Sequence, residues 1–507
     1  MKAEKLVLSS VMLSLTYAGN VMADDAAASE HDVHNDNTKP NIVFIMADDL
    51  GWNDLGYTGS DYYESPNIDR LATQGMIFTN AYSAAANSAP SRACFMSGMY
   101  TPRHGIYTVS PSDRGDKTKR KLIPIPNTED LRSSFVTLGE ALKEQGYTCG
   151  HVGKWHLGDD ADGTGPLSQG FDLNIAGCRA GTPYSYFYPY CSKKKNACHP
   201  GLDKGKEGEY LTDRLTDEAV KFILDSEKEN KPFFLYMAHY AVHAPFHTDK
   251  RFIGHYQDDK SKSDQAKSFA TLIEGMDKSL GDLMDYLNSK GIAENTLIIF
   301  LGDNGGDAPL GPSRGYSSSA PFRGKKGSEF EGGMRVPCII GWAKPSNGNK
   351  FQKKLPIETG GVQSQLGTVM DIYPTLASLS GADIPSSHIV DGHDLSVLLT
   401  GEKDPEKEES FLMHFPHSHR GSYFTMYREG DWKLIYYYNP EHPERPDCAL
   451  YNLKSDPYEH NEVSVSYPDK TRYMLYKMKE RLEKEGALYP VDFDGKEIKP
   501  NIEFFFK

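Results

Sequence analysis

The segment Ser88-Ala-Pro-Ser-Arg92 places a hydroxyl group, a rigid turn and a permanent positive charge close together. Pro90 fixes its own φ angle, and Ser91 can hydrogen-bond to nearby backbone groups and begin a helix. In the first turn of that helix Arg92 faces back toward residue 88, where its guanidinium can hold an anion beside the Ser88 hydroxyl. The same residue types also mark an ordinary helix start, so the segment alone leaves both interpretations open.

Oxygen-bearing side chains follow two apolar segments of the chain. Asp48 and Asp49 end the first segment, and Asp303 and Asn304 end the second. Carboxylate and amide oxygens are the ligands that Ca²⁺ and Mg²⁺ prefer. A vicinal aspartate pair is also common at strand ends and helix caps. The four side chains together predict a site for Ca²⁺, with Mg²⁺ as the alternative.

Positively charged or protonatable side chains occupy similar places, near the ends of apolar segments or in glycine-flanked loops. They are Arg92, Lys154, His156, His243 and Lys326. A single lysine or histidine in such a place is usually solvated or satisfied by a neighbour. The whole set beside a metal would bind a tetrahedral, multiply charged oxyanion ester, and its charges would stabilise transfer at the central atom.

The apolar segments alternate with helical patterns. Strands are expected at 41–47, 76–82, 147–152, 232–240 and 296–301, and helices at 67–74, 135–145, 212–229 and 264–289. The carboxyl ends of parallel strands meet along one edge of an open α/β sheet, and ligands bind there. The sequence therefore predicts an α/β fold, a large and mostly parallel sheet between helices, with the charged residues at one edge.

The composition changes near residue 400, and we expect a catalytic domain over residues 40–400 and a smaller α+β subdomain over 401–507. A strand at 335–342 and a helix at 370–379 complete the first of these. The second is expected to contain a hairpin over 422–438 turning at 429–431, a strand at 449–453 and a helix at 469–485.

The N-terminus has the pattern of a secretory signal peptide. Lys2 and Lys5 precede an apolar run over residues 6–15, and a small-residue cleavage signal ends at Ala23. We expect residues 1–23 to be removed, residues 24–39 to form a flexible segment, and the mature protein to be periplasmic or secreted. The run is too short to span a bilayer and no cysteine follows it, so a membrane anchor is not expected.

Charge and cysteine usage exclude several classes of protein. The chain of 507 residues has 70 acidic and 56 basic residues and a formal net charge of −14, which argues against a general nucleic-acid or anionic-membrane binder. Its 7 cysteines show no CxxC spacing, which excludes a disulfide-built scaffold and the usual cysteine-rich zinc site. Cys191 and Cys198 flank a basic segment and are candidates to close a small surface loop.

The chemistry-bearing residues and the motifs around them resemble the type I sulfatases of the alkaline phosphatase superfamily. Besides Ser88-x-Pro-Ser-Arg92, with Ser97-Gly98 and Arg103 downstream, the resemblance covers nearly the whole mature chain. Its further motifs lie at 41–50, 153–158, 243–245, 302–305, 323–337, 371–375, 428–434 and 450–461. Met99 departs from the pattern, since many relatives carry Arg or Lys there.

The resemblance implies an alkaline phosphatase-like fold and a serine-type bacterial carbohydrate sulfatase. A maturation enzyme would convert Ser88 to formylglycine before export. The hydrated formylglycine would ligate the metal together with Asp48, Asp49, Asp303 and Asn304, and one of its hydroxyls would attack sulfur. Unmodified serine could not expel sulfate by collapsing to an aldehyde, so maturation would be required for turnover.

The resemblance also implies roles for the charged groups. Arg92 and Lys154 would hold the geminal diol, and Lys154, His243 and Lys326 would hold the sulfate oxygens. His243 is expected to protonate the leaving sugar oxygen and His156 to assist release of sulfate, although these two roles are interchangeable at this point. Cys94, His104 and His151 match no functional position of the family, and we interpret them as structural.

The substrate is expected to be a terminal sulfated sugar of a host glycan, desulfated in an exo manner, with galactose or N-acetylgalactosamine as the candidate sugars. Aromatic rings stack on sugar faces, while His and Arg donate to hydroxyls and carboxylates. Candidate contacts come from the insert 177–198 and the run 414–420, and loop packing would explain the same residues. They are Arg179, Tyr184, Tyr186, Phe187 and Tyr188, and His414, His417, His419 and Arg420.

Two other functions compete with this hypothesis. A phosphomonoesterase or phosphodiesterase of the same superfamily would share the fold and the cation site, although relatives with two metals need further His and Asp ligands. A glycan-binding relative without catalysis would lack part of the reactive set, whereas this chain matches all of it.

Overall fold

The structure is a computed structural model, and it describes residues 38–112, 118, 120, 122–309, 319–419, 421–438 and 448–501. The expected signal peptide and nearly all of the expected flexible segment lie outside the described residues. Among the helices that are described, none has the length and apolar character needed to cross a membrane.

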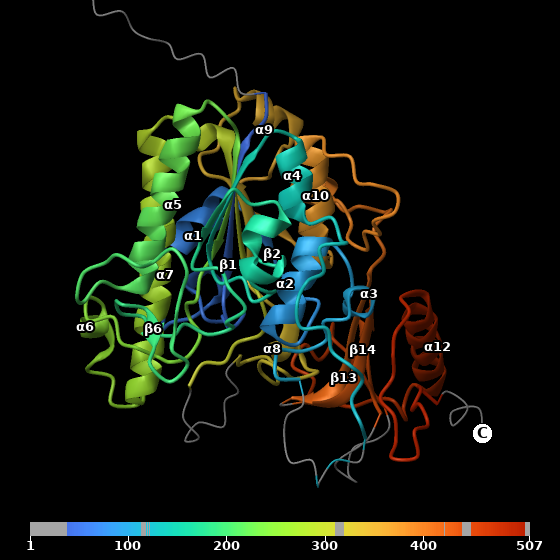
Figure 1. Cartoon of the computed structure of the whole chain (residues 1–507). Helices are drawn as coiled ribbons and strands as arrows, with labels where there is room; N and C mark the ends of the chain where they lie inside the picture. Colours follow the sequence, from blue (N-terminus) through green and yellow to red (C-terminus); the bar gives the residue numbers. More distant parts are fainter. Residues whose placement is uncertain are drawn as a thin grey trace, which may run out of the picture. The chain divides into compact units, whose positions relative to one another are not determined.

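The central feature is a mixed sheet that lies between helices (Figure 1). It has eight strands, in the order β11-β2-β10-β9-β1-β8-β4-β5. Their bounds are β11 Gly361–Gln363, β2 Gly75–Phe78, β10 Cys338–Trp342, β9 Thr296–Gly302, β1 Asn41–Ala47, β8 Phe233–Ala238, β4 Thr148–Gly153 and β5 Leu173–Ile175. Only β10 runs antiparallel to its neighbours in this sheet. Every residue of β1, β8 and β9 is buried, as expected for strands covered by helices on both faces. The predicted α/β fold with a mostly parallel sheet is confirmed.

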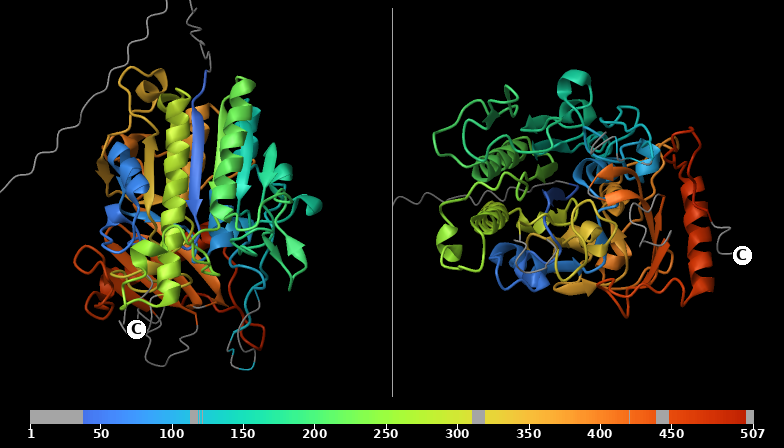
Figure 2. Two further views of the ribbon diagram at one scale, coloured as in Figure 1. Left: turned by 90° about the vertical axis from the view of Figure 1, so that its left-hand side faces the viewer. Right: turned by 90° about the horizontal axis from the view of Figure 1, so that it is seen from below.

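The alternation of side chains along β1 divides the apolar core into two layers. Val43 and Ile45 pack in the cluster formed with α1 (Pro66–Gln74), α5 (Leu211–Lys228) and α7 (Asp264–Ser289). Figures 1 and 2 show α5 and α7 lying along this face of the sheet. Phe44 and Met46 face the other layer, which contains α2 (Ser88–Ser97), α4 (Leu138–Glu144) and α10 (Ile372–Ser380).

The C-terminal part forms a separate antiparallel sheet in the order β13-β14-β15-β16. Its strands are β13 Ser410–His419, β14 Gly421–Glu429, β15 Trp432–Tyr437 and β16 Cys448–Asn452, and helix α12 (Pro468–Lys484) packs on it (Figure 2). The core layer that contains α2 continues into this sheet through residues such as Phe424 and Leu434. The expected hairpin and terminal helix are present, while the domain boundary at residue 400 stays a prediction.

The remaining elements are short. They are β3 Ala81–Tyr82, β12 Gly367–Thr368, β6 Cys191–Ser192, β7 Ala197–Cys198, α3 Thr101–His104, α6 Ile253–Tyr256, α8 Glu331–Met334, α9 Lys350–Lys354 and α11 Ser396–Leu399.

Three expected boundaries were wrong for local reasons. The strand expected over 76–82 is divided into β2 and β3, and β3 pairs with β12 in a sheet of its own. The helix expected from residue 135 begins at Leu138, because Thr137 accepts from the Glu140 amide and forms a capping box. The strand expected from residue 335 begins only after Pro337, which lacks a backbone donor.

Candidate active site

The oxygen-bearing side chains lie at the carboxyl ends of neighbouring strands, as predicted. Ala47 of β1 pairs with Gly302 of β9, so Asp48 and Asp303 leave adjacent strands at the same level. The Asp303 amide donates to the Ala47 carbonyl at 3.0 Å, which continues the pairing into the site. Asp49 follows with a φ angle of 62°, a left-handed conformation that is costly for a residue other than glycine.

These residues form a group suited to a hard cation. One carboxylate oxygen from each of Asp48, Asp49 and Asp303 lies within 4.8 Å of the others. Asp48 Oδ1 and Asn304 Oδ1 are buried and accept no hydrogen bond from the residues that the structure describes. Buried oxygens are rarely left without a partner, and Ca²⁺ or Mg²⁺ takes oxygens of this kind as ligands. The donor set therefore fits the expected metal.

Three buried cations neutralise the three carboxylates. Lys154 Nζ lies 2.7 Å from Asp48 Oδ2, and Lys326 Nζ lies 2.6 Å from Asp49 Oδ1. Arg92 donates to Asp303 Oδ2 through both Nε, at 3.0 Å, and a terminal nitrogen, at 2.8 Å, in the side-on geometry that guanidinium favours. The structure thus joins each predicted cation to a predicted ligand.

Burial and these ion pairs shift the pKa values of the three carboxylates in opposite directions. Burial raises the pKa of Asp48, which the nearby Lys154 only partly offsets. Burial, with the neighbouring Asp48 charge next, raises the pKa of Asp303 to about 6. Burial acts on Asp49 in the same sense, but Lys326 and then His243 outweigh it and hold its pKa well below the usual range.

Ser88 occupies the first turn of α2, and its hydroxyl lies beside a histidine. Ser88 Oγ is 3.2 Å from His156 Nδ1. His156 follows β4 with a φ angle of 64°, and its amide donates to the Cys178 carbonyl at 2.9 Å. Burial, and then the Lys154 charge, hold the pKa of His156 well below its ordinary value, so the ring is neutral around pH 7.

His243 faces the other side of the carboxylate group. Its Nε2 lies 3.5 Å from Asp49 Oδ2, and its Nδ1 lies 2.6 Å from the Ala244 carbonyl oxygen. Burial lowers the pKa of His243 to about 4. The segment before it is fixed to the central strand, because the Val242 amide donates to the Asp48 carbonyl at 2.7 Å.

A cavity of about 550 Å³ opens over Ser88. Its described lining residues are Ser88, Val109, Ser110, His156, Asp159, Arg179, Ala180, Gly181, Thr182, Tyr184, Lys195, His243 and Lys326. This volume lies in the range of small-molecule sites. The cavity therefore joins the reacting residues to a wall built from the insert 177–198.

Only part of the expected sugar-contacting set lines this cavity. Arg179 and Tyr184 do, whereas Tyr186 is buried and its hydroxyl donates to the Tyr240 and His243 carbonyls at 2.8 and 2.9 Å. The remaining two aromatic residues of that set are absent from the described lining: Phe187 packs on Tyr210, and Tyr188 donates to the Asp203 carbonyl.

The expectation that the run 414–420 borders the cavity was wrong for His414 and His417. Both are buried in strand β13, and His414 contacts the Thr425 hydroxyl and the Leu488 carbonyl. The pattern missed a β-strand because Pro416 and three histidines interrupt its apolar alternation. The side chains of His419 and Arg420 lie outside the described residues.

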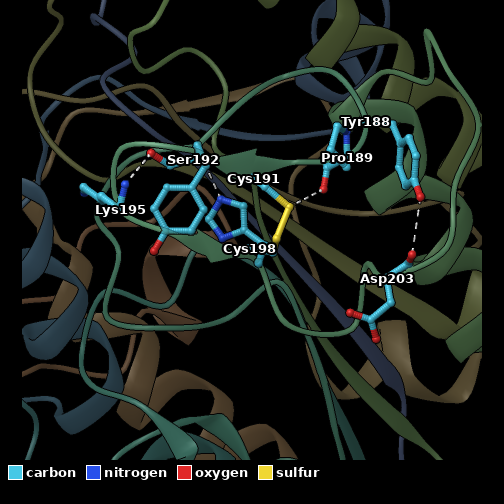
Figure 3. Close-up of a disulfide and its surroundings, with 9 residues drawn as sticks. Tyr188, Pro189, Cys191, Ser192, Lys195, Cys198 and Asp203 are labelled. Carbon is cyan, nitrogen blue, oxygen red and sulfur yellow. Dashed lines mark hydrogen bonds between the residues drawn. A yellow bond between two sulfur atoms is a disulfide. The ribbon is translucent and has the colours of Figure 1, made fainter.

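Sequence reasoning missed several residues of the cavity wall, namely Val109, Ser110, Asp159, Thr182 and Lys195. None of them belongs to a motif with its own chemistry. Lys195 stood in the basic segment between Cys191 and Cys198, which was the one available signal. The structure joins these two cysteines in a disulfide (Figure 3), so the expected pairing is present.

The residues interpreted as structural are buried. The Cys94 sulfur lies 3.4 Å from His104 Nε2, and the Ile106 amide donates to His104 Nδ1 at 3.1 Å. His151 packs among aromatic rings, including Trp155 at 5.3 Å. Met99, the departure from the family pattern, is also buried.

The mixed sheet, with its charged residues at the carboxyl edge, is an alkaline phosphatase-like fold. The sulfatase family model matches residues 40–382, and a second model, described as the C-terminal part of N-sulphoglucosamine sulphohydrolase, matches residues 326–487. The chain belongs to the sulfatase family.

Individual relatives agree with this assignment. N-acetylgalactosamine-6-sulfatase of Mus musculus is 36% identical over 371 residues, and the match covers 70% of this chain and 65% of that protein. The chain therefore spans about two thirds of the length of that relative. A sulfatase of Formosa agariphila is 31% identical, with 95% of this chain and 93% of the relative covered.

Solved structures show the same architecture. Ps i-CgsB in complex with k-i-k-neocarrahexaose has a TM-score of 0.72 and 30% identity, and the match covers 89% of this chain and 94% of that chain. The PsFucS1 sulfatase from Pseudoalteromonas sp. has a TM-score of 0.66 and 26% identity, with 91% and 92% covered.

Proposed function

We propose that the protein hydrolyses sulfate esters of carbohydrates, with a formylglycine made from Ser88 as the nucleophile and Ca²⁺ or Mg²⁺ as the resident metal. The observation that carries this proposal is the position of Ser88 at the base of one cavity, beside three paired carboxylates and cations. A monoanionic ester with three sulfate oxygens is the ligand that such a set would stabilise during transfer.

Asp48, Asp49, Asp303 and Asn304 would hold the metal, which would supply Lewis-acid polarisation of the reacting oxygens. Formylglycine, as the hydrated aldehyde, supplies one hydroxyl that attacks sulfur and a second whose deprotonation lets sulfate leave as the aldehyde re-forms. The other side chains of the site would bind the ester and transfer the protons.

The cations orient and neutralise the ester. Arg92 follows residue 88 by one turn of α2 and donates to the Lys154 carbonyl at 2.9 Å, and we assign these two cations to hold the diol. Lys326 lines the cavity and would bind a sulfate oxygen together with His243. Burial of all three cations strengthens each interaction with the developing charge.

The two histidines differ in what they contact, and this supports a division of roles. His156 lies within 3.2 Å of the residue 88 hydroxyl, so it is placed to take the proton from the diol when sulfate is released. His243 lines the cavity next to Asp49 and is placed to protonate the leaving sugar oxygen. The Asp49 carboxylate would stabilise the charged ring before it donates.

The relatives support a sugar substrate. One relative is named N-acetylgalactosamine-6-sulfatase, and another is solved in complex with k-i-k-neocarrahexaose. We propose exo-acting desulfation of a sulfated galactose or N-acetylgalactosamine. Cleavage of a signal peptide after Ala23 would place the enzyme in the periplasm or outside the cell, where such glycans are met.

The decisive experiment is peptide mass analysis of the protein purified from its native host. The peptide that contains residue 88 should carry the mass of formylglycine. Recovery of unmodified serine alone would refute the mechanism. A Ser88→Ala variant should release no sulfate from any ester while its unfolding temperature stays close to that of the unmodified chain.

An assay of regiospecifically sulfated sugars then tests the activity. Release of sulfate from at least one sugar is expected. Hydrolysis of phosphate esters alone would support the phosphatase alternative, and binding without hydrolysis would support the glycan-binding alternative.

A further inference from the structure

A disulfide-closed hairpin forms the outer wall of the cavity. Strands β6 and β7 pair between Cys191 and Cys198, and the disulfide joins the same two residues (Figure 3). The tip carries Lys193, Lys194 and Lys195, all exposed. Three consecutive lysines stand out in a chain with a net charge of −14. Of the three, Lys195 is the one that lines the cavity.

A stack of rings connects Lys195 to the base of the site. Lys195 Nζ lies 5.5 Å above the Tyr184 ring, a cation–π contact. Tyr184 stacks on His199, with ring centroids 4.4 Å apart and an angle of 15°. His199 packs in turn on Tyr240, whose hydroxyl donates to the Ala176 carbonyl at 3.0 Å. The lysine is therefore positioned by packing as well as by the covalent loop.

The cations of the cavity differ in whether they have a partner. Arg179 is bound by three carboxylates, at 2.5 Å from Asp130, 2.9 Å from Asp159 and 2.8 Å from Asp162. Lys326 is paired with Asp49. Within the described part of the chain, the Lys195 ammonium has no carboxylate within 4.0 Å. Lys195 thus offers the cavity a positive charge that no described carboxylate pairs with.

The two ends of the cavity have different electrostatics. At the base, the cations serve the ester that is cleaved. At the outer wall, His199 stacks on the Tyr184 ring and Lys195 lies above that ring, so Lys195 supplies the charge at this end of the cavity. A cavity of about 550 Å³ has room for a sugar ring between Ser88 at the base and Lys195 at the outer wall. A sugar that fills it would present a substituent, or the next residue of the glycan, to Lys195.

We infer that Lys195 binds a second negatively charged group of the substrate, so that the preferred substrates are sulfated glycans with another sulfate or a carboxylate close to the ester that is cleaved. This inference rests on the proposed sulfatase activity and deepens it. Lys195 is a specificity-determining residue and takes no part in the bond-breaking step. The disulfide closes the loop that carries Lys195 and so limits the positions of this side chain.

The test compares three probes with the mature enzyme and with three variants. The probes are 6-O-sulfo-N-acetylgalactosamine, its 4,6-disulfated form, and a 6-sulfated disaccharide that carries a uronic carboxylate. Lys195→Met should raise KM for a doubly charged probe by about 5- to 10-fold, the range of a partly exposed charge-assisted contact. It should leave kcat, and the KM of the singly charged probe, within about 2-fold.

The matched control is Lys193→Met, which removes the same charge from an exposed position of the same hairpin that does not line the cavity. It should leave every KM within about 2-fold. A Cys191→Ala and Cys198→Ala double variant should reproduce the loss seen with Lys195→Met, because the loop is no longer closed. A rise in KM for the disulfated probe alone would identify a second sulfate as the group that Lys195 binds. A rise for the uronic disaccharide alone would identify a carboxylate.

Equal KM changes for singly and doubly charged probes, or equal effects of Lys195→Met and Lys193→Met, would overturn the inference. An absence of sulfate release from all three probes by the mature enzyme, together with unmodified Ser88, would instead overturn the proposed function. The two failures are therefore distinguishable in one set of measurements.

Discussion

Replacement of Lys154 by methionine tests the buried charge balance of the site. Lys154 Nζ and Asp48 Oδ2 are 2.7 Å apart, and both side chains have 0% of their surface exposed. Removal of one partner from a buried ion pair costs about 3–5 kcal/mol, because the other charge stays buried without compensation. Arg92 remains 4.0 Å from Asp48 Oδ1, so we expect about 3 kcal/mol, near the lower end.

The chain offers a matched control for this variant. Lys143 and Asp172 are also 2.7 Å apart, but their side chains are 48% and 37% exposed. Lys143→Met removes the same ammonium group from an ion pair with the same N···O distance. Because that pair is exposed to water, it contributes only about 0–1 kcal/mol. Chemical unfolding of both variants should therefore separate them by about 2 kcal/mol or more, with Lys143→Met close to the wild type.

Activity provides a second readout of the Lys154 variant. Burial already raises the pKa of Asp48, and loss of Lys154 raises it further, which favours a protonated carboxyl that binds a cation poorly. Loss of a preorganised cation at the reacting centre costs about 10²- to 10³-fold in kcat. Equal unfolding free energies for the two variants, or full activity of Lys154→Met, would refute the assignment of a stabilising charge balance.

Three further predictions concern the surroundings of the site. A Cβ at Gly181 would lie 2.3 Å from the His156 ring, so Gly181→Ala should lower kcat at least about 10-fold, whereas Gly348→Ala, with open space around it, should not. Burial raises the pKa of Asp54 to about 7, above its unfolded value near 4, so the folded chain holds an extra proton and its free energy of unfolding falls as pH rises between about 4 and 7. Asp54→Asn should flatten that slope in unfolding measured against pH. Treatment with EDTA should abolish sulfate release and lower the unfolding temperature, and Ca²⁺ should restore both; full activity of the metal-free protein would contradict the metal assignment.

The sheet and the base of the site could be predicted from the sequence because local patterns determine them. The apolar runs of β1 and β9 are long enough to indicate buried parallel strands, and their last residues must then lie at one edge. Asp48 and Asp303 follow those runs directly, so strand identity alone places them together. The same reasoning placed Lys154 after β4.

The cavity wall could not be predicted in the same way, because an aromatic ring fits both a core and a binding site. Tyr184 and Tyr186 are two residues apart, yet one lines the cavity and the other is buried with its hydroxyl on a carbonyl. Contacts with His199 and Tyr240 decide between them, and both come from other parts of the chain. His414 and His417 were misassigned because β14 and more distant residues such as Tyr107 bury them.

The burial of α2 bears on the order of events in the life of this protein. Ser88 is 1% exposed, and every residue of α2 is buried between the sheet and the layer around it. A second enzyme would have to reach Ser88 and its neighbours in α2, and the folded molecule does not expose them. We therefore expect the proposed conversion of Ser88 to take place on the unfolded chain, so that maturation competes with folding and chains that fold first lack their nucleophile.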